Sequence, residues 1–156
     1  MSYRAERPGD RLFGAYFSAA PVQGYPAQRS LSAGMVDADA SILRQAYAYH
    51  KAADYDLALV SFRAFLESNP VPESDETLLL AGTSAVATGN YAEGAEYLRR
   101  VDENGAFAAE ARWHLALLDL REGSLAAARG ELRRISEAPA GRSLPVGELL
   151  EKIPVR

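Results

Sequence analysis

The chain has 156 residues, of which 48% are hydrophobic and 24% are charged, and its formal net charge is −4. These values predict one soluble globular domain and argue against two independent ones. The absence of cysteine excludes disulfides, thiolate metal sites and cysteine nucleophiles. A pI near 5.2 argues against nucleic acid as a partner, because binding to phosphates needs a basic face. Apolar runs are too short for a membrane span, so we expect no insertion by this chain.

Residues 1–38 are predicted to form an N-terminal arm. Residues 1–11 are polar and do not resemble a secretory signal, so we expect any export or anchoring segment to lie outside this chain and leave its compartment open. Four apolar residues recur at helical spacing and predict a short amphipathic helix: Leu12, Phe13, Tyr16 and Phe17. Prolines and glycines within residues 18–34 then predict an irregular or extended connector.

From residue 39 onward the spacing of apolar residues predicts an all-α body. Six helices are expected: Ala40–Lys51, Asp56–Glu67, Glu76–Thr88, Ala92–Asp102, Ala108–Arg121 and Leu125–Ser136. Five polar residues are each predicted to cap the helix that follows by accepting a backbone N–H: Asp39, Asp54, Ser74, Asn90 and Ser124. Residues 143–156 contain a further apolar pattern, which predicts a C-terminal helix that covers the end of the body.

The helical body repeats itself. Three turns follow one another at intervals of 36 and 34 residues: Ala53-Asp54-Tyr55, Gly89-Asn90-Tyr91 and Gly123-Ser124-Leu125. The same intervals separate four further sets of matching residues: Ala46, Gly82 and Ala116; Ala58, Gly94 and Ala128; Phe62, Leu98 and Leu132; and Phe65, Val101 and Ile135. Small residues at matching positions of paired helices allow close packing, so this register predicts three helical hairpins.

These positions resemble the tetratricopeptide repeat, whose pattern has a small residue in helix A, an aromatic one turn later, a Gly-Asn/Asp-Tyr turn and an alanine in helix B. Pro70 and Pro139 match the proline that closes a repeat, whereas the helix-A aromatic is kept only as Tyr49. The resemblance implies a right-handed α-α superhelix, or solenoid, over residues 39–140. Its three hairpins would span residues 39–70, 74–105 and 107–139. With its arm, the layout is similar to tetratricopeptide domains of bacterial proteins, membrane-anchored ones among them.

No catalytic residues are predicted. His50 and His114 lie on different repeats, and neither has a second ligand at helical spacing. Phosphate-loop and activated-serine patterns are also missing from the sequence. We therefore expect no enzyme activity, no cofactor and no metal site.

The resemblance instead implies a non-catalytic adaptor or scaffold that binds a protein or peptide. Helix A of each hairpin would line an apolar concave groove, and helical spacing places nine residues in it: Leu43, Tyr47, His50, Leu79, Thr83, Val86, Trp113, Leu117 and Leu120. These residues differ from the lysine, arginine and asparagine of a carboxylate clamp, so none is predicted. Two interpretations stay open. A partner helix or extended peptide docks on Trp113 and Tyr47, or the chain's own N-terminal arm fills the groove of a structural, homo-oligomerising domain. The sequence does not decide the oligomeric state.

Overall fold

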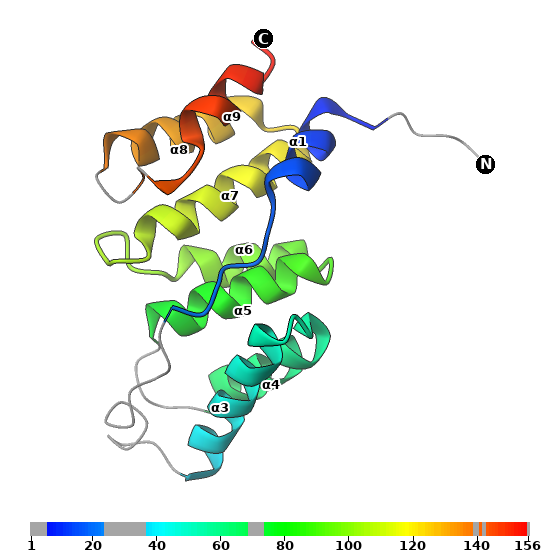
Figure 1. Cartoon of the computed structure of the whole chain (residues 1–156), viewed down its shortest axis with the longest axis vertical. Coiled ribbons are helices and arrows are strands. Elements are labelled where there is room, and N and C mark those ends of the chain that lie inside the picture. The colour runs from blue at the N-terminus through cyan, green and yellow to red at the C-terminus, as the bar shows by residue number, and fades with distance from the viewer. Residues whose placement is uncertain (1–5, 24–36, 69–73, 139–140, 142, 156) are drawn as a thin grey trace, which may run out of the picture. The chain divides into compact units, whose positions relative to one another are not determined.

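The computed structural model describes residues 6–23, 37–68, 74–138, 141 and 143–155 (Figure 1). It divides the chain into two compact units, one of Met1–Ser18 with Asp102–Arg156 and one of Ala19–Val101. Within the described residues all regular structure is helical, which confirms the predicted all-α class. None of the helices in this part of the chain is both long and apolar enough to cross a membrane. The closing prolines Pro70 and Pro139 and most of the predicted connector lie outside the described residues.

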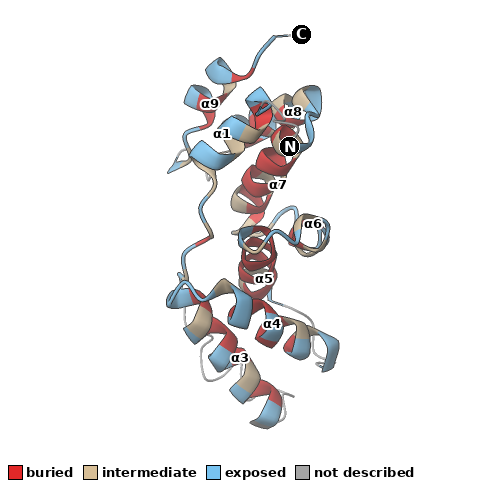
Figure 2. Ribbon diagram, turned by 90° about the vertical axis from the view of Figure 1, so that its right-hand side faces the viewer, coloured by how far each residue is buried: buried red, intermediate tan, exposed pale blue. Residues whose placement is uncertain are grey.

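The unit of Ala19–Val101, here called the α3–α6 unit, contains two helical hairpins. Its helices are α3 (Asp37–Lys51), α4 (Tyr55–Ser68), α5 (Asp75–Ala87) and α6 (Tyr91–Arg99). Each helix packs against the next one, and α5 also contacts α3. Such packing of consecutive helices is what a solenoid of tetratricopeptide-like hairpins requires. Because α5 has neighbours on several sides, every residue from Thr77 to Val86 is buried (Figure 2).

The other unit, here called the α7–α9 unit, contains the third hairpin with the arm helix and the C-terminal helix. Its helices are α1 (Pro8–Tyr16), α7 (Ala108–Glu122), α8 (Leu125–Glu137) and α9 (Val146–Lys152). Helix α1 packs on α7, and α9 packs on α8, where Leu149 joins the hydrophobic core. The predicted helices at both ends therefore exist. However, α1 begins at Pro8, before the apolar run, because proline favours the first helical turn.

The three turns predicted to be equivalent adopt the same backbone conformation. Ala53, Gly89 and Gly123 all have a left-handed φ, at 60°, 85° and 86°. In each case the residue immediately before helix B donates its backbone N–H to a carbonyl of helix A: Asp54 N–H to Tyr49 O at 2.9 Å, Asn90 N–H to Ala85 O at 2.8 Å and Ser124 N–H to Asp119 O at 2.8 Å. This is the hydrogen bonding of a glycine-type helix end. The repeat register seen in the sequence is therefore a structural register.

The small residues lie where the paired helices approach closely. A methyl group built on Gly94 would lie 2.7 Å from Cγ2 of Val86 and 2.8 Å from the carbonyl oxygen of Gly82. The corresponding alanines of the other hairpins are fully buried, as are the bulky residues one turn further along helix B: Ala46, Ala58, Ala116, Ala128, Phe62 and Leu132.

Of the five predicted caps, those of Asp54 and Ser74 are confirmed. Asp54 Oδ1 accepts the Leu57 N–H at 3.4 Å at the start of α4. The Ser124 side chain makes no cap hydrogen bond at the start of α8. Ser74 Oγ accepts the Thr77 N–H at 3.0 Å at the start of α5. The Asn90 side chain makes no cap hydrogen bond; its amide instead donates to Thr88 Oγ1 at 3.0 Å. Asp39 lies within α3 instead of before it, and accepts a hydrogen bond from Ser68 Oγ at 3.0 Å. That bond fastens the first turn of α3 to the last turn of α4.

Candidate functional site

The nine residues predicted to line a groove are all buried, none being more than 5% exposed: Leu43, Tyr47, His50, Leu79, Thr83, Val86, Trp113, Leu117 and Leu120. The first six belong to the α3–α6 unit and the last three to the α7–α9 unit. Whether these residues form a core or a binding site depends on which residues cover them in each unit.

In the α7–α9 unit the arm lies on the predicted residues. The Tyr16 ring meets the Trp113 indole edge-on, with ring centroids 6.2 Å apart. Trp113, Leu117 and Leu120 belong to one hydrophobic core, and the four apolar residues of the arm pack against it: Leu12, Phe13, Tyr16 and Phe17. Their burial is therefore explained in part by a segment of the same chain.

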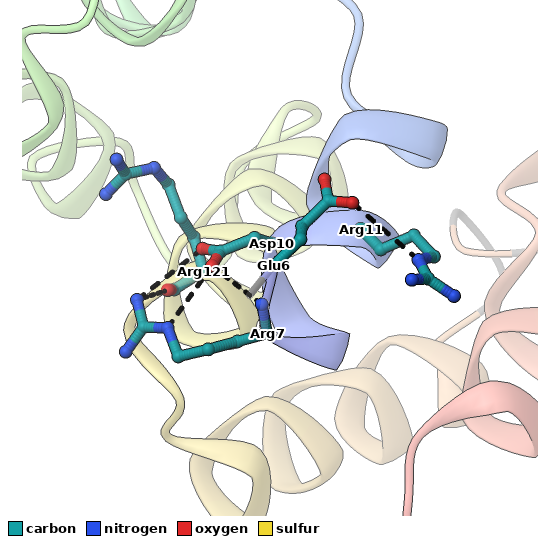
Figure 3. A network of polar contacts seen from close by, with 5 residues as sticks. All are labelled: Glu6, Arg7, Asp10, Arg11 and Arg121. Carbon is teal, nitrogen blue, oxygen red and sulfur yellow. Dashed lines mark hydrogen bonds and ion pairs between the residues drawn. The ribbon is translucent and has the colours of Figure 1, made fainter. Parts of the chain in front are cut away.

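Polar contacts fix the start of the arm helix to the end of α7 (Figure 3). The Arg7 guanidinium donates to the Arg121 carbonyl at 2.8 Å, where a cation complements the helix C-terminus. The Asp10 carboxylate accepts from Arg7 Nε at 3.2 Å and from the Arg7 backbone N–H at 3.3 Å. The hydrogen bond from the Arg7 side chain lowers the pKa of Asp10.

The other end of the arm helix is joined to α9. The Tyr16 hydroxyl donates to Glu148 Oε1 at 2.6 Å, and Lys152 Nζ lies 5.2 Å from the centre of the Tyr16 ring. The hydrogen bond from Tyr16 lowers the pKa of Glu148. Tyr16 thus contacts both α7 and α9.

In the α3–α6 unit a short extended segment, residues 19–23, lies on α3 and α5. Ala20, which is only 3% exposed, has both backbone polar atoms bonded to side chains. Its N–H donates to Thr83 Oγ1 at 3.3 Å, and its carbonyl accepts from His50 Nε2 at 2.6 Å. The Gln23 N–H donates to Glu76 Oε2 at 3.1 Å. The surface therefore holds a polypeptide by its main chain.

The tautomer of His50 follows from these partners. A carbonyl oxygen only accepts, so Nε2 carries the proton that Ala20 receives. In the neutral ring Nδ1 then accepts, and the Ser84 hydroxyl donates to it at 2.7 Å. Burial lowers the pKa of His50, which favours this neutral form. Tyr55 and Phe62 meet the ring edge-on at centroid distances of 5.2 and 6.3 Å and hold its orientation.

Two other predicted residues, Tyr47 and Val86, contact neighbouring helices of the same unit. Tyr47 donates or accepts a 3.0 Å hydrogen bond with Thr77 Oγ1 and packs edge-on against Phe62, and burial raises its pKa to about 12. Val86 reaches α6 at Gly94. The structure thus brings His50 and Thr83 together at Ala20, whereas Tyr47 contacts α4 and α5 and Val86 contacts α6.

Ser84, Glu76 and Ala20 were missed as site residues by the sequence analysis. A signal for Ser84 exists, because Thr83 and Ser84 are adjacent polar residues in an otherwise apolar helix, and buried polar groups need partners. Ala20 offers no such signal, since its contribution is made by backbone atoms that every residue has.

His114 is buried without a hydrogen bond at Nδ1, and the Phe17 ring lies edge-on to it at 5.8 Å. Burial lowers its pKa to about 4. Among the described residues no group of three histidine or acidic side chains is placed to hold a metal ion.

Comparison with protein families finds a match between residues 40–70 and the tetratricopeptide repeat. No curated protein and no solved structure matches the chain significantly. The matched residues span most of α3 and all of α4, and the turn that joins these helices recurs in the other two hairpins. Tetratricopeptide repeats typically form non-catalytic modules that bind proteins. Residues 40–70 are therefore similar to a tetratricopeptide repeat, and the recurring left-handed turns show that the other two hairpins share its register.

Proposed function

We propose that the chain is a non-catalytic interaction module that binds a protein or peptide through the first helices of its hairpins. One observation carries the proposal. His50 and Thr83, two of the nine predicted binding residues, donate to and accept from the main chain of an extended segment at Ala20. A surface that holds one extended polypeptide has the chemistry to hold another, because every polypeptide offers the same backbone groups.

The burial of the nine residues limits how a partner reaches them. A partner contacts His50 and Thr83 only after residues 19–23 are displaced from them. It contacts Trp113 only after Tyr16 is displaced. Truncation of Trp113 or Leu79, which are 5% and 1% exposed, would remove core packing worth about 3–5 kcal/mol and would unfold the protein before it reported on binding. Substitutions that change hydrogen bonding at constant volume are therefore the appropriate probes.

A peptide library displayed on phage and panned on the full-length chain tests the proposal. Selected peptides should bind saturably in fluorescence anisotropy, and hydrogen exchange should show protection on α3, α5 or α7. Matched measurements on Thr83→Val and on Thr88→Val separate the site from the rest of α5, because Thr88 bonds only carbonyls of its own helix and the Asn90 amide. Selection of no saturable binder, or protection confined to α4, α6 and α8, would contradict the proposal.

The alternative is a structural domain that self-associates while its arm fills this surface. The contacts of Tyr16 and Ala20 favour the occupation of this surface by the arm. Sedimentation equilibrium of the full chain at micromolar concentration tests whether the domain self-associates. A dimer would support self-assembly, and a monomer would remove it.

A further inference from the structure

Residues 19–23 lie on α3 and α5 in a manner that resembles a bound peptide. The segment has no helical structure, and Figure 1 shows it as an extended trace along α5. Three hydrogen bonds hold it, and in each the segment contributes a backbone atom and the helices contribute a side chain. Recognition of this kind depends little on the sequence of the segment.

Selectivity comes from the one buried side chain. Ala20 is 3% exposed, whereas Pro21 and Gln23 are exposed and Val22 is half-buried. Because Ala20 is buried, a long charged side chain in its place would lose its contact with water, and this disfavours such a residue here. Pro21 adds a second preference, because the residue before a proline is restricted to extended conformations. A small residue followed by proline is therefore both accommodated and already extended before binding.

The helices prepare the site through buried polar side chains. Thr83 and Ser84 are fully buried on α5, and His50 is 4% exposed on α3. Ser84 orients the His50 ring by bonding to Nδ1, so that Nε2–H points to the Ala20 carbonyl. Thr83 Oγ1 also contacts the Leu80 carbonyl at 3.4 Å, which leaves its oxygen to accept the N–H of the segment.

The segment is also able to leave. Ala20 is the one buried residue of the segment, and a cavity of about 270 Å³ lies beside the segment where it faces the ends of α3 and α4. This cavity is lined by the segment and by three residues of the hairpin: His50, Lys51 and Tyr55. Release of the segment therefore does not require the α3–α4 hairpin to open.

We infer that residues 19–23 are an intramolecular ligand of a backbone-binding site formed by His50, Thr83 and Glu76, and that the ligand class of this site is an extended peptide with a small residue followed by proline. The inference rests on the proposed function in one respect, because it takes this surface as the one that a partner uses. Occupation in cis then regulates partner binding: a tethered segment competes at a high effective concentration, and a partner must displace it.

The test uses the full-length chain and a fluorescein-labelled peptide with the sequence of residues 18–23, Ser-Ala-Ala-Pro-Val-Gln, blocked at both ends. Ala20→Arg puts a long charged side chain in place of a buried methyl group and should expel the segment. The peptide should then bind this variant at least tenfold more tightly than it binds the wild-type chain. Ser18→Arg is the matched control, because it adds the same charge at an exposed position two residues away, and it should behave as wild type.

A second substitution locates the site. In the Ala20→Arg chain, Thr83→Val removes the acceptor for the peptide N–H at nearly constant volume and should weaken peptide binding about threefold to tenfold. Thr88→Val on the same helix should leave it unchanged. A peptide with arginine in place of its second alanine, at the position of Ala20, should not bind.

Peptide binding that is equal in the wild-type, Ser18→Arg and Ala20→Arg chains, or that is unaffected by Thr83→Val, would overturn the inference. If Ala20→Arg fails to fold, amide exchange of the otherwise unaltered chain gives the answer: Thr83→Val should speed exchange at Ala20 several-fold, and Thr88→Val should not. The peptide result is separate from the phage selection. Binding of this peptide without any selected binder would contradict the proposed function alone, and selected binders that leave residues 19–23 protected would contradict this inference alone.

Discussion

A methyl group built on Gly9 would lie 1.8 Å from the carbonyl oxygen of Leu120. The arm helix α1 therefore touches the backbone of α7 at a residue that has no side chain. Next to this contact Arg7 donates to the carbonyl of Arg121, the residue after Leu120. The absence of a side chain at residue 9 thus determines how closely the arm docks.

Gly9→Ala should destabilise the protein. The clash is with backbone, so one of the two helices must move, at a cost of about 2 kcal/mol, or roughly 4–8 °C in melting temperature for a chain of this size. Binding of a hydrophobic dye should rise as the arm residues leave the core around Trp113. Thermal melting followed by circular dichroism, with dye fluorescence at 25 °C, measures both effects.

Gly14→Ala is the matched control, because it lies in the same helix and a methyl group there has nothing within 4 Å. Both substitutions replace glycine by a better helix former, which favours the helix by up to about 1 kcal/mol. Gly14→Ala should therefore melt at the wild-type temperature or slightly above it. Equal melting temperatures for the two variants would show that α1 does not dock on α7 as described.

Much of the fold could be predicted because its signals are local. Helix α4, Tyr55–Ser68, is predicted from the sequence at Asp56–Glu67, and the repeat register places all three turns at the correct residues. Apolar periodicity and turn residues are properties of neighbouring positions, so a single sequence contains them.

The contacts that define the candidate site are not local. The Ala20 carbonyl and His50 are 30 residues apart, and the Ala20 N–H and Thr83 are 63 apart. In each case one partner is a backbone atom, which leaves no mark on the composition of the segment. Sequence reasoning therefore found His50 and Thr83 through their place on helix A, and could not find what they bind.

The left-handed turns predict that Gly89→Ala and Ala53→Gly have opposite effects on stability. Ala53 has a φ of 60° that alanine adopts at a cost of roughly 1–2 kcal/mol, whereas Gly89 has a φ of 85° without strain. Gly89→Ala should therefore destabilise the chain by about 1 kcal/mol. Ala53→Gly should be neutral or stabilising, although glycine in place of alanine usually costs stability through the unfolded chain. Urea unfolding at 25 °C measures both, and a destabilising Ala53→Gly would contradict the strain at this turn.

The contact between α5 and α6 is tight enough to exclude a methyl group. Gly94→Ala would place Cβ 2.8 Å from the Gly82 carbonyl oxygen, so we expect a loss of about 1–3 kcal/mol despite the better helix propensity of alanine. Gly130→Ala in α8, where nothing lies within 4 Å, should be neutral or stabilising by up to about 1 kcal/mol. Urea unfolding midpoints compare the two variants. A Gly94→Ala chain as stable as wild type would mean that α5 and α6 are far enough apart to accommodate a methyl group.

The buried His114 predicts that stability falls as the pH is lowered from 7.5 to 5. Burial lowers its pKa from 6.5 to about 4, so between these values the unfolded chain binds a proton that the folded chain does not. Unfolding then takes up a proton, and the free energy of unfolding decreases by about 2 kcal/mol between pH 7.5 and pH 5. His50, whose pKa burial also lowers, acts in the same direction.

His114→Phe isolates the contribution of His114, because it keeps an aromatic ring beside Phe17 and removes the unpartnered Nδ1. The variant should be at least as stable as wild type at pH 7.5 and should lose about 2 kcal/mol less on transfer to pH 5. The remaining pH dependence belongs to His50 and to the carboxylates, which both chains share. Urea titrations at the two pH values give the four free energies required. Identical losses in the two chains would mean that the His114 ring reaches solvent, in which case the core between α1 and α7 is open where Phe17 closes it here.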